Sequence, residues 1–348
     1  MINKTDTHLH MGSYDKKSNE VMLDTVSSLG VTDASILALS AYHEYSIIQN
    51  IMCLYWKWRY KKMNLRVFGS FHEIDFYKEI PYEKQLEKLL ELGVDGMKFI
   101  HMKPDVRKML GKGINHPSYD KAFSMMEERG VPVLIHSGDP ENFWDKPAEG
   151  GSGIYYDDSF LHYEKLYEEN FEMLDRHPKL KVTFAHFFFL SNFPDKARAV
   201  LDKYPNVNFD LTPGWEMFLG FSKDIDLWQK FFEEYSDRIL FGTDTNDHKN
   251  YNSAIHKLVY DGLTHDKTEF KMPCYGGHIM KGLDLPDAVV NKICHDNYFK
   301  FVGKNVARVD INKLKSAAES MLSDISCRND VLEKESCVKW LTDFISEV

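Results

Sequence analysis

The sequence has few cysteines, no long apolar run and no cluster of basic residues. Its five cysteines are scattered and form no CxxC pair, which argues against a disulfide framework or a zinc ribbon. No apolar run approaches the length that crosses a bilayer, and the N-terminus has no basic region followed by an apolar stretch. We therefore expect a cytoplasmic protein with reduced thiols and no membrane partner.

The charge of the chain is acidic overall. The net charge is −10 at pH 7, and no lysine-rich or arginine-rich segment stands against it. Nucleic-acid binding draws much of its affinity from neutralised phosphates, so we expect no nucleic-acid partner. With 43% hydrophobic and 28% charged residues, the composition is that of a folded globular protein. The expected ligand is a small molecule.

Short β-rich segments alternate with segments of helical periodicity along most of the chain. The expected strands are residues 3–10, 34–40, 65–71, 95–101, 132–138, 181–187, 207–212 and 238–244. The clearest helical segments are 82–94, 119–131, 193–205 and 227–235. Eight such units predict an α/β fold, a (β/α)₈ TIM barrel. The alternative is a doubly wound open sheet, but its Gly-rich fingerprint is absent after the first strand.

The barrel is expected to span residues 1–262 or so, and the remainder reads as helices. These C-terminal helices, over about 279–348, include segments 279–303 and 313–325. Because no Gly-, Ser- or Pro-rich linker precedes them, we expect them to pack on the barrel within a single domain, 1–348. Outer helices of this kind offer a surface for a homodimer, although the sequence defines no interface.

The first expected strand carries the segment DTHLH, residues 6–10, with polar side chains on alternate positions. Asp6, His8 and His10 therefore share one face of that strand. In a TIM barrel the chemistry lies at the carboxyl ends of the strands. Polar residues stand at such ends along the rest of the chain: Lys98, His136, His186, Asp210 and Asp244. Imidazoles and a carboxylate around one centre are ligands of zinc, manganese and iron, so the set predicts a metal site.

The same motifs carry a resemblance to a known family. The chain resembles the amidohydrolase superfamily, and most closely its branch of TIM-barrel metal-dependent hydrolases that includes α-amino-β-carboxymuconate semialdehyde decarboxylase. DTHLH is similar to the family's HxH, VLIHSG to its strand-five histidine, TFAHF to its strand-six histidine and FGTD to its strand-eight aspartate. HDNYFKFVG (295–303) looks like its closing segment.

The resemblance implies a role for each matched residue. His8, His10, His136 and Asp244 become the metal ligands, and His186 becomes a catalytic or second-metal histidine. Asp6 is interpreted as an acceptor that orients an imidazole, or alternatively as a strand-edge carboxylate held by backbone amides. Two further residues are expected to bind the substrate: Asp210, at the end of the seventh strand, and Trp215, in the loop that follows, for which packing in a lid is the alternative. Asp210 is equally well interpreted as a structural aspartate.

Lys98 has two interpretations. In binuclear relatives a carboxylated lysine on the fourth strand bridges two metals, whereas in the single-metal branch a lysine there is an ordinary ammonium near the substrate. The closer resemblance to the single-metal branch favours one ion, most simply zinc, with manganese or iron as the alternatives. Lys98 then binds the substrate or pairs with a carboxylate.

The expected reaction is hydrolysis of a small amide, lactone or ester that bears a carboxylate. A divalent metal activates water, Asp244 accepts its proton, and His186 polarises the scissile carbonyl or stabilises the oxyanion. The alternative reaction is a metal-dependent non-oxidative decarboxylation of a small aromatic or unsaturated carboxylic acid. A third interpretation, a barrel that binds a ligand without turning it over, has no sequence feature in its favour.

Overall fold

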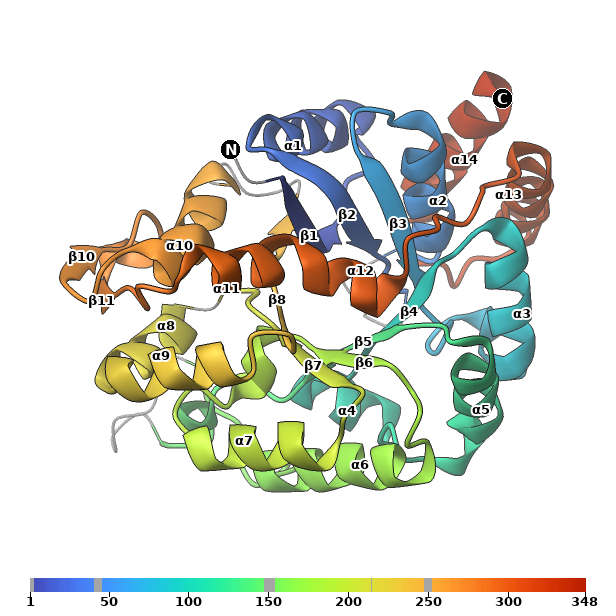
Figure 1. The fold of residues 1–348 in the computed structure, drawn as a ribbon. Coiled ribbons are helices and arrows are strands. Elements are labelled where there is room, and N and C mark those ends of the chain that lie inside the picture. The colour runs from blue at the N-terminus through green and yellow to red at the C-terminus, as the bar shows by residue number, and fades with distance from the viewer. Residues whose placement is uncertain (1–2, 41–45, 147–153, 214, 247–251) are drawn as a thin grey trace.

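The computed structural model is a barrel of parallel strands surrounded by helices (Figure 1). It describes residues 3–40, 46–146, 154–213, 215–246 and 252–348. The sheet runs in the order β8-β7-β6-β5-β4-β3-β2-β1-β9, and all its neighbouring strands are parallel. Its strands are β1 (Lys4–His10), β2 (Val31–Leu37), β3 (Asn64–Gly69), β4 (Gly96–Met102), β5 (Val133–Ser137), β6 (Val182–Phe184), β7 (Val207–Asp210), β8 (Ile239–Leu240) and β9 (Thr245–Asn246). The predicted TIM barrel is confirmed.

The eighth strand differs from the prediction, because it is interrupted between β8 and β9. The Phe241 carbonyl accepts from the Thr7 amide, and β9 pairs with β1, so the two pieces together close the barrel. Between them Thr243 donates to the Asp6 carboxylate, and Asp244 takes a left-handed φ of 53°. A left-handed residue cannot continue a strand, so the ladder stops where the candidate ligand stands.

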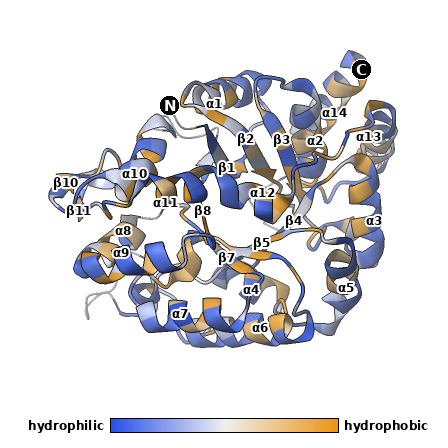
Figure 2. Ribbon diagram, viewed as in Figure 1, coloured by the Kyte–Doolittle hydropathy of each residue, from blue (hydrophilic) through white to orange (hydrophobic). Residues whose placement is uncertain are grey.

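Amphipathic helices cover the outside of the barrel. They are α1 (Lys16–Ser28), α2 (Gln49–Arg59), α3 (Tyr82–Leu92), α4 (Pro104–Leu110), α5 (Asp120–Arg129), α6 (Tyr163–Arg176), α7 (Pro194–Lys203), α8 (Trp215–Lys223), α9 (Ile225–Glu234) and α10 (Asn252–Thr264). In α3, Tyr82, Leu86 and Leu89 recur at helical spacing and are buried, and Gly93 ends the helix with a left-handed φ of 104°. Hydrophobic and hydrophilic residues alternate around the helices in Figure 2, as this spacing requires.

A helical segment crosses the barrel at the amino ends of the strands (Figure 1). It comprises α11 (Asp287–Asn291), a π-helical turn (Lys292–Asp296) and α12 (Asn297–Val302). Phe301 packs with the inward-facing Leu37, Phe68 and Leu134, and the Asn297 amide donates to two carbonyls beside β8. This end of the barrel is therefore filled by side chains, which leaves the carboxyl ends of the strands for chemistry.

The last helices, α13 (Ile311–Ser326) and α14 (Lys334–Glu347), join the same hydrophobic core as the barrel. Trp340 meets the Tyr55 ring of α2 edge to face, at 5.5 Å between centroids. The expectation that 279–303 is helical throughout is wrong at its start. Ile279–Lys281 is β11 and pairs antiparallel with β10 (Glu269–Lys271), because Gly276 and Gly277 supply the positive φ angles of a hairpin turn.

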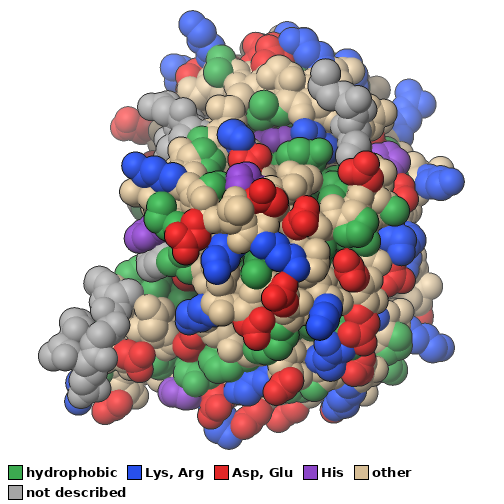
Figure 3. All heavy atoms as spheres, turned by 60° about the vertical axis from the view of Figure 1, so that its left-hand side comes forward, with side chains coloured by type: hydrophobic (Ala, Val, Ile, Leu, Met, Phe, Trp, Pro, Cys, Tyr) green, Lys and Arg blue, Asp and Glu red, His purple; other side chains and the backbone are tan. Residues whose placement is uncertain are grey.

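The surface carries charges of both signs. On the face in Figure 3, acidic and basic side chains are interspersed, with hydrophobic side chains between them. Within the described ranges, no helix combines the length and apolarity needed to pass through a membrane.

Candidate functional site

Three predicted ligands meet at the carboxyl end of β1. His8 Nε2 and His10 Nε2 lie 3.1 Å apart, and Asp244 Oδ1 lies 3.5 Å and 3.1 Å from them. One ligand atom from each of the three residues falls within 4.8 Å of the others. The two histidines share a face of β1, and the left-handed turn at Asp244 brings the third group to them.

The hydrogen bonds of the two imidazoles assign their tautomers. His8 Nδ1 faces the Asp210 carboxylate at 3.1 Å, and His10 Nδ1 faces the Leu37 carbonyl at 3.3 Å. Both partners only accept, so the Nδ1 of each imidazole carries a hydrogen. Burial lowers the pKa of His8 well below its usual value, so this imidazole is neutral at pH 7. The Nε2 lone pair of His8, the Nε2 atom of His10 and a carboxylate oxygen of Asp244 therefore converge on one point.

His136 and His186 form a second convergent pair. His136 Nδ1 lies 3.2 Å from His186 Nε2. Their other ring nitrogens face carbonyls, Gly138 O at 3.0 Å and Thr212 O at 3.1 Å, so lone pairs point at each other. Burial lowers the pKa of both imidazoles, that of His186 to about 4, so neither is protonated at pH 7.

Lys98, on β4, lies beside His8. Its Nζ is 3.4 Å from His8 Nε2, and its side chain is almost fully buried. Burial lowers the pKa of Lys98 to about 8, against the opposing charges of Asp210 and Asp244. The ammonium is therefore placed to donate to an oxygen of a bound molecule.

Asp6 and Asp210, the other two aspartates predicted for the site, hold neighbouring groups in place. Asp6 accepts from the backbone of His8 and from Thr243, so it holds β1 to the interrupted strand, as the structural alternative described. Asp210 orients the His8 imidazole and also accepts from the His186 and Thr212 amides. With both oxygens engaged and no exposure, Asp210 is not placed to bind substrate. Trp215 begins α8, and its side chain lies outside the described part of the structure.

A strained turn aims His186. Residues His186–Phe189 all have φ near 50°, a conformation that costs about 1–2 kcal/mol per residue. The His186 amide donates to Asp210 and to the Thr212 hydroxyl, and Phe187 and Phe188 are fully buried among aromatic side chains. Packing and hydrogen bonds together hold a backbone that the sequence alone would not predict.

The four histidines of the site, Lys98 and Asp244 line a cavity of about 250 Å³. Sequence reasoning missed four of its polar members: Lys103, Asp139, Glu216 and Asn246. Asp139 follows β5 in HSGD and Lys103 follows β4, so the rule that polar residues past strand ends face the site could have found them. Phe143 and Phe189 supply the aromatic part of the wall.

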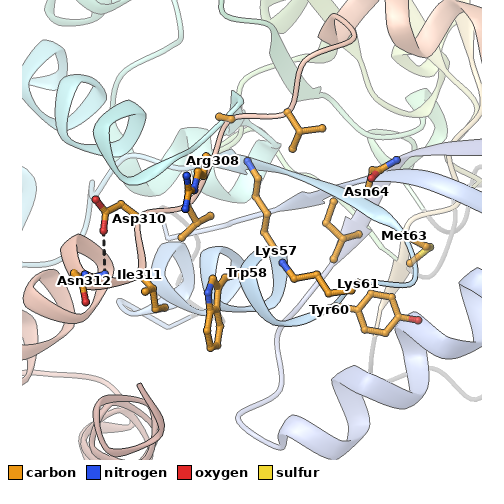
Figure 4. A pocket seen from close by; sticks show the side chains of 14 residues that line it. Lys57, Trp58, Tyr60, Lys61, Met63, Asn64, Arg308, Asp310, Ile311 and Asn312 are labelled. Carbon is orange, nitrogen blue, oxygen red and sulfur yellow. Dashed lines mark hydrogen bonds between the residues drawn. The ribbon is translucent and has the colours of Figure 1, made fainter.

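A larger cavity, of about 770 Å³, lies beside the amino end of β3 (Figure 4). Lys57 there pairs with Asp95, and Asp310 caps α13. The described residues that line this cavity include no histidine and no convergent set of carboxylates, so its size does not make it a catalytic site.

The comparisons with known proteins place the fold. A model of the amidohydrolase family matches residues 52–303, a range that starts after the DTHLH segment. No curated protein matches the chain. A TIM-barrel protein of Bordetella bronchiseptica is 15% identical, with a TM-score of 0.54 over 86% of this chain and 97% of that one. A 2,6-dihydroxybenzoate decarboxylase from Rhizobium is 14% identical, with a TM-score of 0.55 over 87% and 99%. A 4-oxalomesaconate hydratase from Rhodopseudomonas palustris is 13% identical, with a TM-score of 0.51 over 93% and 100%.

Proposed function

We propose, from the premise that the chain belongs to the amidohydrolase family, that it is a metal-dependent hydrolase of a small amide, lactone or ester. The observation that carries the proposal is the convergence of imidazole nitrogens and the Asp244 carboxylate at the carboxyl ends of the strands. The lone pairs of His136 and His186 that face each other repel, and a bound cation would remove that repulsion.

The donor set fits one divalent ion, most simply zinc. His8, His10 and Asp244 would hold it. His136, which lies outside that cluster and faces His186, is the fourth ligand that the resemblance implies. Asp210 supports this set from behind by fixing the tautomer of His8. Bound there, a divalent ion acts as a Lewis acid and lowers the pKa of a water molecule from about 16 to near 7.

Side chains of the protein would then carry out the proton transfers and stabilise the developing charge. Asp244 Oδ1 faces the two imidazoles, so Oδ2 accepts the proton of the attacking water and passes it to the leaving group. His186 Nε2 carries a lone pair and so cannot donate to an oxyanion, which revises the role expected for it from the sequence. The Lys98 ammonium is the better donor to a developing oxyanion or to a substrate carboxylate.

The experiment that tests the proposal combines metal analysis with substitution. We expect about one equivalent of metal per chain in protein purified without added metal or chelator, and loss of both metal and hydrolysis in His136→Ala. His136→Ala with unchanged metal content and turnover would contradict the proposal. A chain that neither contains nor takes up metal would return the histidines to a structural role, and two equivalents would favour Lys98 as a bridging carbamate.

Labelled water separates hydrolysis from the decarboxylation that the sequence leaves open. A hydrolase incorporates one oxygen atom from ¹⁸O water into its product. A decarboxylase instead releases carbon dioxide and takes up a solvent proton, without that oxygen. We expect ¹⁸O incorporation on a panel of small amides, lactones and esters.

A further inference from the structure

Glu216 occupies a junction in the candidate site. It is the second residue of α8. It lines both the cavity of about 250 Å³ that holds the histidines, called the catalytic cavity below, and an adjoining cavity of about 220 Å³. The two cavities share Pro140, His186 and Phe189 as further lining residues. A substrate held beside the histidines and extending past Phe189 would therefore pass the Glu216 carboxylate.

The other carboxylates of this region already have partners. Asp139 accepts from the Tyr156 hydroxyl and pairs with Lys103 at 3.5 Å. Glu141 accepts from the Asn192 amide, which is held in turn by Lys223. Glu216 differs: within the described ranges no lysine, arginine or histidine forms an ion pair with it, and its own backbone amide is its hydrogen-bond partner.

The environment of Glu216 disfavours an unpaired negative charge. Burial raises the pKa of its carboxyl, and the nearby charges of Asp139 and Glu141 raise it further. A cation placed in the adjoining cavity would relieve both effects. Lys98 also lines the cavity that holds the histidines, and its ammonium lies beside His8. The lining of the two cavities therefore includes a buried ammonium as well as the Glu216 carboxylate.

We propose that Glu216 is a specificity-determining residue that binds a cationic nitrogen of the substrate, an ammonium or guanidinium group. The proposal rests on the proposed function, because it assigns the adjoining cavity to the part of the substrate away from the scissile bond. The substrate class is then a small zwitterionic amide or ester, with a carboxylate or carbonyl oxygen toward Lys98 and an amine toward Glu216.

Matched pairs of small ligands test the charge preference directly. The probes are 4-aminobutyrate and 6-aminohexanoate, each compared with its hydroxyl counterpart, 4-hydroxybutyrate or 6-hydroxyhexanoate. Affinities for the full chain, in buffer supplied with zinc, are measured by calorimetry or ligand-observed NMR. We expect at least one amino compound to bind about tenfold or more tightly than its hydroxyl counterpart.

Substitution assigns the preference to one carboxylate. Glu216→Gln should abolish the amino preference while leaving the affinity for the hydroxyl compounds within about twofold of the wild type. Glu319→Gln, on the exposed face of α13, is the matched control and should change neither. Equal affinity for both members of every pair, absence of binding, or a preference that survives in Glu216→Gln would each overturn the proposal.

The outcome is separable from that of the proposed function. An amino preference that depends on Glu216, in a protein that takes up no metal, would refute the hydrolase and keep the binding role. Metal uptake and hydrolysis without any amino preference would keep the hydrolase and refute the binding role of Glu216.

Discussion

Asp210 connects two histidines that the sequence places far apart. One oxygen accepts from His8 Nδ1 at 3.1 Å, and the other accepts from the His186 amide at 2.9 Å. The carboxylate therefore fixes the tautomer of one imidazole and the backbone position of the other. A residue with both functions controls the site without entering the cavity.

We expect Asp210→Asn to weaken metal binding by about 10- to 100-fold while the chain still folds. The amide oxygen is a weaker acceptor for His8 Nδ1–H, and its NH₂ group cannot accept from the His186 amide. A competitive metal titration measures the affinity, and circular dichroism checks the fold. Asp195→Asn, exposed on α7, is the control. Equal metal affinity in Asp210→Asn would show that Asp210 does not tune the ligands.

A buried carboxylate away from the site controls stability at low pH. Burial alone would raise the pKa of Glu73, but hydrogen bonds from His101 and Tyr82 and the charge of Lys112 lower it to about 2. Glu73 accepts from His101 at 2.9 Å, from Tyr119 at 2.8 Å and from Tyr82 at 2.7 Å. The folded chain thus stabilises the ionised carboxylate of Glu73 more than the unfolded chain does.

The sign of the pH dependence follows from that lowered pKa. The contribution of Glu73 to the free energy of unfolding is fully present above its unfolded pKa, near 4.5, and is lost as the pH falls toward 2. We expect Glu73→Gln to lower the free energy of unfolding by about 3 kcal/mol at pH 7. The difference from the wild type should shrink as the pH falls from 4.5 toward 2, in urea titrations at each pH. A difference that is constant with pH would contradict this role.

Residue types and spacing were enough to bring His8, His10 and Asp244 together, because the barrel sends all strand ends to one rim. The sequence could not say which aspartate meets an imidazole. Asp6 shares the face of His8 by periodicity, yet a bulge in β1 and the closing strand turn it to backbone amides. Glu216 was missed because it stands within a helix that follows a loop, where no periodicity marks a cavity.

At the scale of elements, the turn after β6 is where the sequence misleads most. TFAHF has the composition of a strand, and 181–187 was predicted as one, but β6 ends at Phe184. The next four residues from His186 are left-handed because burial of Phe187 and Phe188 outweighs their backbone preference. Phe187 stacks on Phe232 of α9, and Phe188 stacks on Phe184. Tertiary packing, which no local pattern records, decides this conformation.

We expect Phe187→Ala to cost about 3–5 kcal/mol of stability and to disturb His186 as well. The cavity left behind removes the packing that holds the strained turn, so the turn relaxes. Urea denaturation gives the stability, and metal affinity reports on the site. Phe123→Ala, equally buried between α5 and β4, should cost similar stability but keep the metal affinity. Equal loss of metal affinity in both variants would mean that the turn has no special role.

At the scale of the whole molecule, one core joins the barrel and the C-terminal helices. Most of the fold could be predicted because each βα unit repeats the same signals: an apolar strand, an amphipathic helix and a Gly or Pro between them. The interrupted eighth strand and the β10–β11 hairpin could not, since they depend on positive φ angles, at Asp244 in the first case and at Gly276 and Gly277 in the second. The core itself, which includes Leu314 and Trp340, follows from packing that the sequence only suggested.

Buried cysteines test whether that core unfolds as one unit. Cys294 lies in the π-helical turn between α11 and α12, Cys337 lies in α14, and both side chains are buried. Burial raises the pKa of Cys294 to about 12, so its thiol is inert in the folded state. We expect iodoacetamide to label both thiols at the same urea midpoint, measured by mass spectrometry of peptides. Exposed Cys327 should react without urea and is the internal control. Labelling of Cys337 at clearly lower urea than Cys294 would show that α13 and α14 detach before the barrel unfolds, and would contradict a single cooperative core.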